Sequence, residues 1–335
     1  IEDGGYFGDF SETALADYTA WMSRVHKTGV AGWPALPPSV APDTRIAREP
    51  VYYQWAQWRA VRLAEVLGEC AAEVRAAAPR LSVYAFSYID LAPPAGYAPG
   101  YLEESPDFDA YLGCISLDHG FFARRGADRS RAVAMGAGGA LKRVAAELDL
   151  VSAYTDPVHL ESYARHLLLM NGQPRPFLPA WWAPGKPGGW AEGFWSPYSD
   201  ELGREMIRAV NRNRALAGGE SVADVAVIHP DLSGMGAMAS WGPWASEEFK
   251  ACHTDVVRHL AAVGSNFDLL TEDTLTAAKL RPYRLVVATM PALYAHVRKA
   301  LTDCKAELLV LGWSGLVTVP GPEDRLPGAE SWTGA

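Results

Sequence analysis

Apolar residues follow two spacings in the first part of the chain. Residues 12–25 carry apolar side chains three and four positions apart, the repeat of an amphipathic helix, and residues 51–78 do so over a longer stretch. The longer apolar line runs through Tyr52, Trp55, Leu63, Val66, Leu67, Cys70 and Val74. Short continuous apolar runs predict buried strands at residues 81–86, 111–117, 143–148 and 176–181.

Helices are expected to alternate with these strands. Further stretches with helical spacing occur at residues 130–141, 157–170 and 199–216. Such alternation predicts a parallel sheet with helices outside it. Four strand–helix units are half of the eight in a (β/α)8 TIM barrel. We therefore expect residues 1–219 to form the C-terminal half of such a barrel, strands five to eight, starting at the end of strand four.

The pattern restarts after residue 220. Strands are expected at residues 222–229, 266–270, 284–289 and 307–311, with helices at residues 246–263 and 296–304. This order predicts a second α/β domain of the doubly wound type, at residues 220–335. It contains no Gly-rich phosphate loop, so no nucleotide cofactor is expected there.

Composition excludes several classes of function. The net charge of −9 argues against binding to nucleic acid, which requires a basic face. No apolar run reaches the roughly 18 residues that cross a bilayer, so no membrane partner is expected. The four cysteines are scattered, without CxxC or Cys–His spacing, so no metal is expected. The twelve tryptophans fit either a large core or a carbohydrate site, because indole rings stack on sugars as readily as they fill cores.

Carboxylates at the carboxyl ends of strands are the candidates for chemistry, because catalytic groups of parallel barrels lie there. Glu2 stands in a stretch rich in glycine and aromatic residues that includes Tyr6. Glu147 ends an apolar strand, with Asp149 on the same side of the extended chain. A solvated chain end for Glu2 and a structural ion pair for Glu147 are the alternatives.

A third candidate follows the predicted strand 111–117. Asp118 and His119 come directly after it and are expected to form a wall of a binding site, although a polar strand cap is possible. Glycoside hydrolysis needs two carboxyl groups that face each other across the scissile bond. Loops after two different strands can supply such a pair, and Glu2 and Glu147 are separated by two strand–helix units.

The start of the chain resembles the acid/base segment of glycoside hydrolase family 42 β-galactosidases. That family has Asn-Glu-Tyr-Gly-Gly or close variants followed by a helix, and this chain has Ile1-Glu2-Asp3-Gly4-Gly5 and then Ala16 to Met22. Residues 131–149 resemble the family's approach to its nucleophile. The resemblance implies that Glu2 is the general acid/base and Glu147 the nucleophile of a retaining β-galactosidase.

Two further segments carry the resemblance. Trp181 and Trp182, with Trp190 in a Gly-Gly-Trp sequence, resemble the loop after strand eight, which implies that these indoles line the sugar site. Residues 222–315 resemble the flavodoxin-like domain that mediates trimer contacts in that family, which implies a homo-oligomer. Carbohydrate is the implied partner, and no cofactor is implied.

Two other functions remain open. A catalytically inactive carbohydrate-binding relative is one, which Ile1 favours because it replaces the family's Asn. An oligomerisation module with the barrel as scaffold is the other. Half a barrel has open strand edges and an uncovered core, so the 335 residues alone are expected to be inactive and prone to aggregation.

Overall fold

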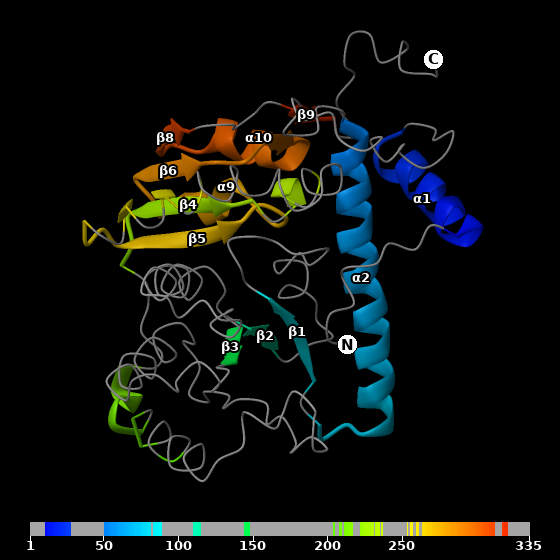
Figure 1. The fold of residues 1–335 in the computed structure, drawn as a ribbon, viewed down its shortest axis with the longest axis horizontal. Coiled ribbons are helices and arrows are strands. Elements are labelled where there is room, and N and C mark those ends of the chain that lie inside the picture. The colour runs from blue at the N-terminus through cyan, green and yellow to red at the C-terminus, as the bar shows by residue number, and fades with distance from the viewer. Residues whose placement is uncertain are drawn as a thin grey trace, which may run out of the picture.

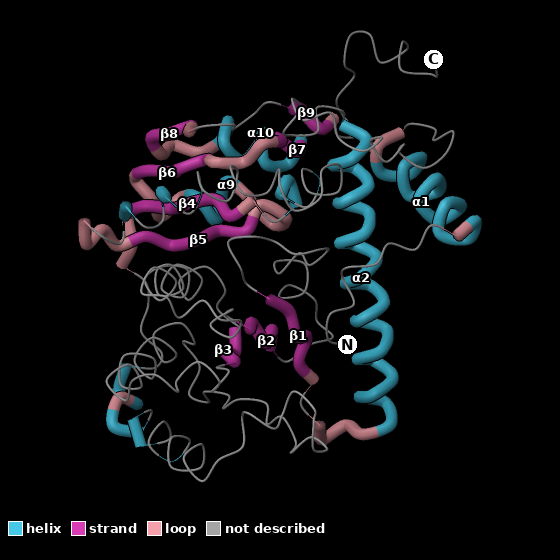
Figure 2. The backbone as a smooth tube through the Cα atoms, viewed as in Figure 1, coloured by secondary structure: helices cyan, strands magenta, loops and turns pink. Residues whose placement is uncertain are grey.

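The computed structural model describes part of the chain. It covers residues 11–27, 50–81, 83–88, 110–114, 144–147, 204, 208–209, 211–216, 222–230, 232–234, 236, 253, 255–256, 259–260, 263–311 and 317–320. Within these residues the strands form three parallel sheets (Figures 1 and 2). The predicted helices 130–141 and 157–170 and the predicted strand 176–181 lie outside the described residues.

The first sheet has the order β1-β2-β3, in which β1 is Tyr84–Tyr88, β2 is Ala110–Cys114 and β3 is Val144–Glu147. All pairs are parallel, as the alternation of helices and strands predicts. The first strand begins three residues later than expected, because Leu81 lies in a bend and is 59% exposed. The three strands run in the same direction, so their carboxyl ends lie at the same edge of this sheet.

The second sheet has the order β5-β4-β6-β8 and is also parallel. Its strands are β4 (Val225–His229), β5 (Phe267–Thr271), β6 (Leu285–Ala288) and β8 (Glu307–Val310). All four were expected from the apolar runs. The chain moves outward from β4 in both directions, so the order reverses between β4 and β6. In β8 every residue is exposed, and β8 pairs with β6 alone among the described strands.

Shorter elements complete this part of the chain. The helices are α9 (Ala277–Leu280), α10 (Ala295–Asp303) and the 3-10 turn η3 (Arg214–Leu216). A two-stranded parallel sheet pairs β7 (Ala292–Tyr294) with β9 (Val317–Val319). The described residues between 204 and 212 and between 253 and 260 are helical, as expected from the helical spacing of the two segments around them.

Helix α2 (Pro50–Ala77) links the two larger sheets. It begins with Pro50, which suits the first helical position because that residue's N–H has no partner within a helix. Figure 1 shows α2 running alongside the second sheet and down past β1. Its N-terminal half places Tyr53, Ala56 and Ala60 in one core with Ile228 and Val286 of the second sheet.

The C-terminal half of α2 packs on the opposite face of the same sheet. Ala71, with Leu63 and Leu67 beside it, packs against Val227 and Phe267. The apolar line predicted for this helix is partly wrong. Val66 and Val74 are 44% and 43% exposed, and Cys70 is exposed. The buried face of α2 is formed in part by alanines, among them Ala56, Ala60 and Ala71. The predicted line followed the larger apolar residues instead.

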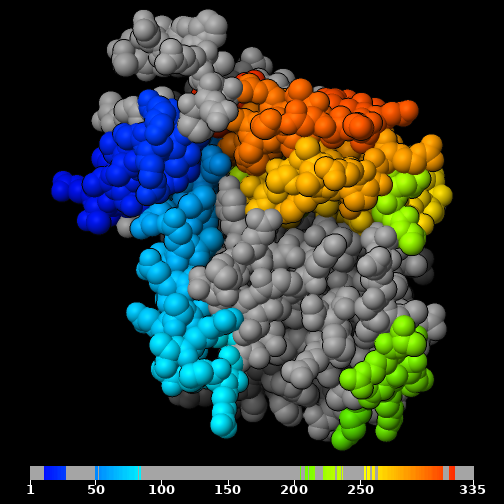
Figure 3. Space-filling model, turned by 180° about the vertical axis from the view of Figure 1, so that it is seen from behind, coloured from blue at the N-terminus to red at the C-terminus, as the bar shows by residue number. Residues whose placement is uncertain are grey.

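Helix α1 (Glu12–Val25) packs against α2 through a separate aromatic core. Ser11 caps its N-terminus, because its Oγ accepts a hydrogen bond from the Ala14 N–H at 3.2 Å. The core contains Tyr18, Trp21, Met22, Trp55 and Trp58. Figure 3 shows α1 lying on α2 at one side of the molecule, next to the elements of the second sheet.

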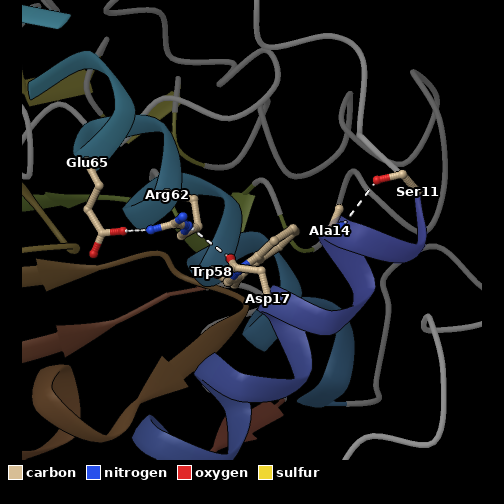
Figure 4. Close-up of polar contacts among 6 residues, drawn as sticks. All are labelled: Ser11, Ala14, Asp17, Trp58, Arg62 and Glu65. Atoms are coloured by element: carbon tan, nitrogen blue, oxygen red, sulfur yellow. Dashed lines mark hydrogen bonds and ion pairs between the residues drawn. The ribbon is translucent and has the colours of Figure 1, made fainter. Parts of the chain in front are cut away.

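One carboxylate ties the two helices together (Figure 4). Trp58 Nε1 donates to Asp17 Oδ2 at 2.9 Å, and Arg62 Nε lies 2.9 Å from the same oxygen. Arg62 also pairs with Glu65 one turn further along α2. The ion pair is partly exposed, whereas the Trp58 ring is 6% exposed and depends on Asp17 to accept from its N–H.

Replacement of Asp17 should separate the contribution of the hydrogen bond from Trp58 from that of the ion pair with Arg62. Asp17→Ala leaves the buried Trp58 N–H without this acceptor, so we expect a loss of about 1–3 kcal/mol in the free energy of unfolding. Asp17→Asn keeps an acceptor oxygen and removes only the partly exposed ion pair, so we expect a loss below about 1 kcal/mol. Urea denaturation of both variants tests this, and equal losses would contradict it.

A histidine ties α1 to the C-terminal part of the chain. His26 caps the C-terminus of α1, and its Nδ1–H donates to the Pro320 carbonyl oxygen at 2.8 Å. Burial lowers the pKa of His26 below its ordinary value, although the bond to Pro320 opposes the shift. The ring is therefore neutral at neutral pH, and residues almost 300 positions apart are held together beside β9.

Candidate functional site

The carboxyl ends of the first three strands lie side by side. Tyr88 of β1 pairs with Cys114 of β2, and Cys114 pairs in turn with Glu147 of β3. Glu147 is thus the last residue of a parallel strand, at the edge where catalytic groups of parallel barrels gather. The role of Glu147 as a nucleophile stays a prediction.

The other predicted site residues fall outside the described residues. They are Glu2, Tyr6, Asp118, His119, Asp149, Trp181, Trp182 and Trp190. The sequence places Asp118 four residues beyond the end of β2 and Asp149 two residues beyond the end of β3. The pairing of Glu2 with Glu147 across one cleft stays a prediction, as do the aromatic walls.

Comparison with known proteins bears on the fold. No protein-family model and no curated protein matches the sequence. Solved structures do match. The chain has the fold of GH42 β-galactosidases. A β-galactosidase from Rahnella sp. R3 superposes with a TM-score of 0.63 and 16% identity. A catalytic mutant of the GH42 β-galactosidase Gan42B from G. stearothermophilus gives 0.65 and 11%.

A third neighbour is the β-galactosidase from Bacillus circulans sp. alkalophilus, with a TM-score of 0.63 and 12% identity. Each of these superpositions covers 94% of this chain and 51% of the neighbour. The chain therefore spans about half the length of the solved structures that it matches. At these identities the likeness concerns the fold, and the chemistry must be argued from the residues.

A second group of polar residues lies at the carboxyl ends of the second sheet. We call it the buried polar cluster. It consists of His229, Ser233, His253, Glu272 and Thr289. His229 ends β4, Glu272 follows β5 and Thr289 follows β6, so the cluster spans the point at which the strand order reverses.

Hydrogen bonds join the members of the buried polar cluster. His229 Nδ1 lies 3.4 Å from His253 Nε2, and His253 Nδ1 lies 2.8 Å from Thr289 Oγ1. Ser233 Oγ lies 2.9 Å from Glu272 Oε2, and the Ser233 N–H donates to Glu272 Oε1. Each of these buried polar side chains thus has a hydrogen-bond partner, as is usual for polar groups inside proteins.

Burial also sets the charge of this cluster. Desolvation lowers the pKa of His229 to about 4, so the ring is neutral near pH 7. Desolvation raises the pKa of Glu272 to about 8, although bonds from Ser233 oppose the shift, so its carboxyl group holds a proton near pH 7. None of the site residues predicted from the sequence belongs to this cluster. The available signal was that three apolar strands each end in a polar residue.

The part of the chain that the structure describes forms neither a metal centre nor a membrane span. Within it, no three His, Cys, Asp or Glu residues lie close enough together to hold a metal ion. No helix of the described residues is both long and apolar enough to cross a membrane.

Proposed function

We propose that the chain belongs to a retaining glycoside hydrolase of the β-galactosidase type. Two independent observations support this. The fold is that of GH42 β-galactosidases, and Glu147 ends a parallel strand, where such a barrel carries its nucleophile. The second observation carries the proposal, because a carboxylate residue at the carboxyl end of a parallel strand supports a role in the chemistry.

The proposal includes the domain organisation. Residues 1–219 supply strands five to eight of a TIM barrel, of which β1, β2 and β3 are the described part. Residues 220–335 form a flavodoxin-like domain, supported by the parallel order β5-β4-β6-β8 and its reversal between β4 and β6. In the complete protein this domain takes part in a homo-oligomer.

The proposed reaction proceeds in two steps at the anomeric carbon. Glu147 attacks this carbon while Glu2 donates a proton to the leaving oxygen, which gives a covalent glycosyl-enzyme. Glu2 then removes a proton from water, which attacks the same carbon and releases Glu147. A retaining mechanism requires the two carboxyl groups to lie about 5–5.5 Å apart in the complete barrel.

The remaining site residues would bind the sugar. Trp182 and Trp190 would stack on its apolar faces, with Tyr6 and Trp181 as further aromatic walls. The polar residues expected to bind the hydroxyl groups are Asp118, His119 and Asp149. Such bonds matter because those that strengthen in the transition state raise the rate rather than only the affinity.

The test uses a protein that carries both halves of the barrel. Hydrolysis of p-nitrophenyl β-galactoside is followed by proton NMR within the first turnovers, before mutarotation mixes the anomers. The β-anomer is expected first. The α-anomer would overturn the retaining mechanism. Saturable galactose binding without hydrolysis would favour the inactive carbohydrate-binding relative, and neither binding nor hydrolysis would overturn the proposal as a whole.

A further inference from the structure

Two hydrogen bonds to the backbone groups of Glu272 hold this residue in place. It follows β5 directly and is wholly buried. Its N–H donates to the carbonyl oxygen of His229 at 3.2 Å, and its carbonyl oxygen accepts from His296 Nε2 at 2.8 Å. These two bonds fix the residue between β4 and α10, so that its carboxyl group has a set direction.

The carboxyl group contacts the segment that follows β4. Ser233 meets both of its oxygens, through the N–H and through Oγ. Ser233 belongs to a helical segment that includes residues 232–234 and 236. The position of this segment relative to the sheet therefore depends on the contact between Glu272 and Ser233.

The same segment packs directly on α2. A Cβ atom placed on Gly236 would lie 2.3 Å from Cδ1 of Tyr53, so the segment approaches this ring as closely as only glycine allows. Tyr53 is wholly buried, and its carbonyl oxygen accepts from the Tyr294 hydroxyl at 2.9 Å. A continuous line of contacts thus leads from Glu272 through Ser233 and Gly236 to Tyr53 of α2.

Burial and a neighbouring carboxylate favour the neutral form of the Glu272 carboxyl group. The hydroxyl and N–H of Ser233 and the N–H of Leu232 oppose this effect, because they donate hydrogen bonds that favour the charged form, but these groups carry no charge themselves. The Asp273 carboxylate repels a negative charge on Glu272. His296, which bonds to the backbone of Glu272, is mostly buried, and burial lowers the pKa of its ring. None of these groups carries a positive charge near neutral pH.

We propose that Glu272 and Ser233 form a proton-dependent clasp that couples the second sheet to helix α2. With the proton present, the carboxyl group donates to Ser233 Oγ through one oxygen and accepts the Ser233 N–H through the other. Without it, a negative charge stands in the core beside Asp273. Water must then reach the carboxylate, and the segment that carries Ser233 and Gly236 has to move away from Tyr53.

The direction of the pH dependence follows from the raised pKa. The folded pKa of about 8 lies above the ordinary value of 4.5 for a glutamate side chain. The group therefore contributes stability that is fully present below pH 4.5 and is lost as the pH rises through 8. Between pH 4.5 and 8, the equilibrium for opening the clasp is expected to increase about tenfold for each pH unit, because opening then releases one proton, and it should level off above pH 8.

Hydrogen exchange of the intact chain between pH 6.5 and 9.5 tests the clasp. After correction for intrinsic exchange, peptides that contain residues 232–236 and the first turns of α2 should lose protection as the pH rises from 6.5 to 8 and should show little further loss above pH 8. Glu272→Gln keeps the shape and the hydrogen-bonding capacity but cannot ionise, so its protection should not change with pH. Asp268→Asn is the matched control. Asp268 is also buried on β5 and accepts from the Tyr283 hydroxyl at 2.8 Å.

Two results would overturn the clasp. One is wild-type protection that does not change up to pH 9.5, and the other is the same loss in Glu272→Gln as in the wild type. If Glu272→Gln does not fold, glutamate labelled with ¹³C at the carboxyl carbon gives the answer in the wild type. The resonance that shifts in Ser233→Ala should titrate near pH 8, and titration of that resonance near pH 4.5 would overturn the clasp. The proposal does not depend on glycosidase activity.

Discussion

Glu147→Gln is expected to lower kcat/KM for nitrophenyl β-galactosides by at least about a thousandfold in a protein that carries both barrel halves, which is a loss of about 4 kcal/mol in transition-state stabilisation. The amide has nearly the shape of the carboxylate but cannot form the glycosyl-enzyme. Substrates with poor and with activated leaving groups should both be affected, because neither leaving group departs unless Glu147 attacks the anomeric carbon. Initial rates with p-nitrophenyl and dinitrophenyl β-galactosides measure this.

Addition of a small nucleophile distinguishes a nucleophilic role of Glu147 from a structural one. Glu147→Ala leaves space beside the anomeric carbon, so added azide should attack from the face that Glu147 occupied and give the α-galactosyl azide. Glu73→Gln is the control variant, since Glu73 is exposed on α2 and should leave the rate unchanged. Retention of a tenth or more of the activity in a folded Glu147→Gln protein would remove Glu147 from the mechanism.

Glu2 should respond differently to substitution. Glu2→Gln removes the proton donor, which a poor leaving group needs and a dinitrophenolate does not. Formation of the glycosyl-enzyme from the dinitrophenyl substrate should therefore stay fast in this variant, while its hydrolysis slows. A burst of dinitrophenolate followed by slow turnover is the expected trace. The same loss with every leaving group would show that Glu2 acts by another route.

Elements with a strong internal pattern could be predicted from the sequence. Helix α1 was expected at residues 12–25 and occupies Glu12–Val25, since its apolar repeat and its Ser11 cap agree. The strands of the second sheet were expected within three residues of their bounds. Their continuous apolar runs leave few alternatives, because a buried parallel strand has no polar face.

The elements that were missed depend on partners far away in the chain. The strands β7 and β9 have three residues each and exist because they pair across more than twenty positions. The buried face of α2 uses Ala56, Ala60 and Ala71, which resemble surface positions until the sheet lies against them. The buried polar cluster combines five residues from separate segments, and the polar residues at the ends of three apolar runs indicate only part of it.

The candidate site also has a part that the local sequence predicts and a part that depends on the assembled fold. The apolar run before Glu147 was enough to predict a strand that ends at that residue, and β3 ends there. The register that aligns Glu147 with Cys114 and Tyr88 is a property of the sheet. The distance between Glu2 and Glu147 depends on closure of a whole barrel, which no single segment encodes.

The contact between Tyr53 and Gly236 should show strong coupling in a double-mutant cycle. Tyr53→Ala removes a wholly buried ring and is expected to lower the free energy of unfolding by about 4 kcal/mol. Gly236→Ala places a methyl group 2.3 Å from Cδ1 and 2.9 Å from Cγ of that ring. The buried ring has little room to move, so we expect a loss of about 2 kcal/mol from overpacking.

The two losses should not add, because each variant removes the reason for the other's effect. With Ala at position 53, the methyl group at position 236 no longer meets the ring, although it still lies 3.0 Å from the Cα of residue 53. Alanine in a helical segment is also favoured over glycine by up to about 1 kcal/mol. Gly236→Ala should therefore cost less in the Tyr53→Ala background than in the wild type, by urea denaturation at pH 7. Gly264→Ala is the control. Gly264 has a φ of 71° and nothing within 4 Å of its added Cβ, so its loss comes from backbone strain and should add to that of Tyr53→Ala. Simple additivity at Gly236 would mean that the segment does not press on Tyr53, and the line of contacts from Glu272 to α2 would then be broken at its last step.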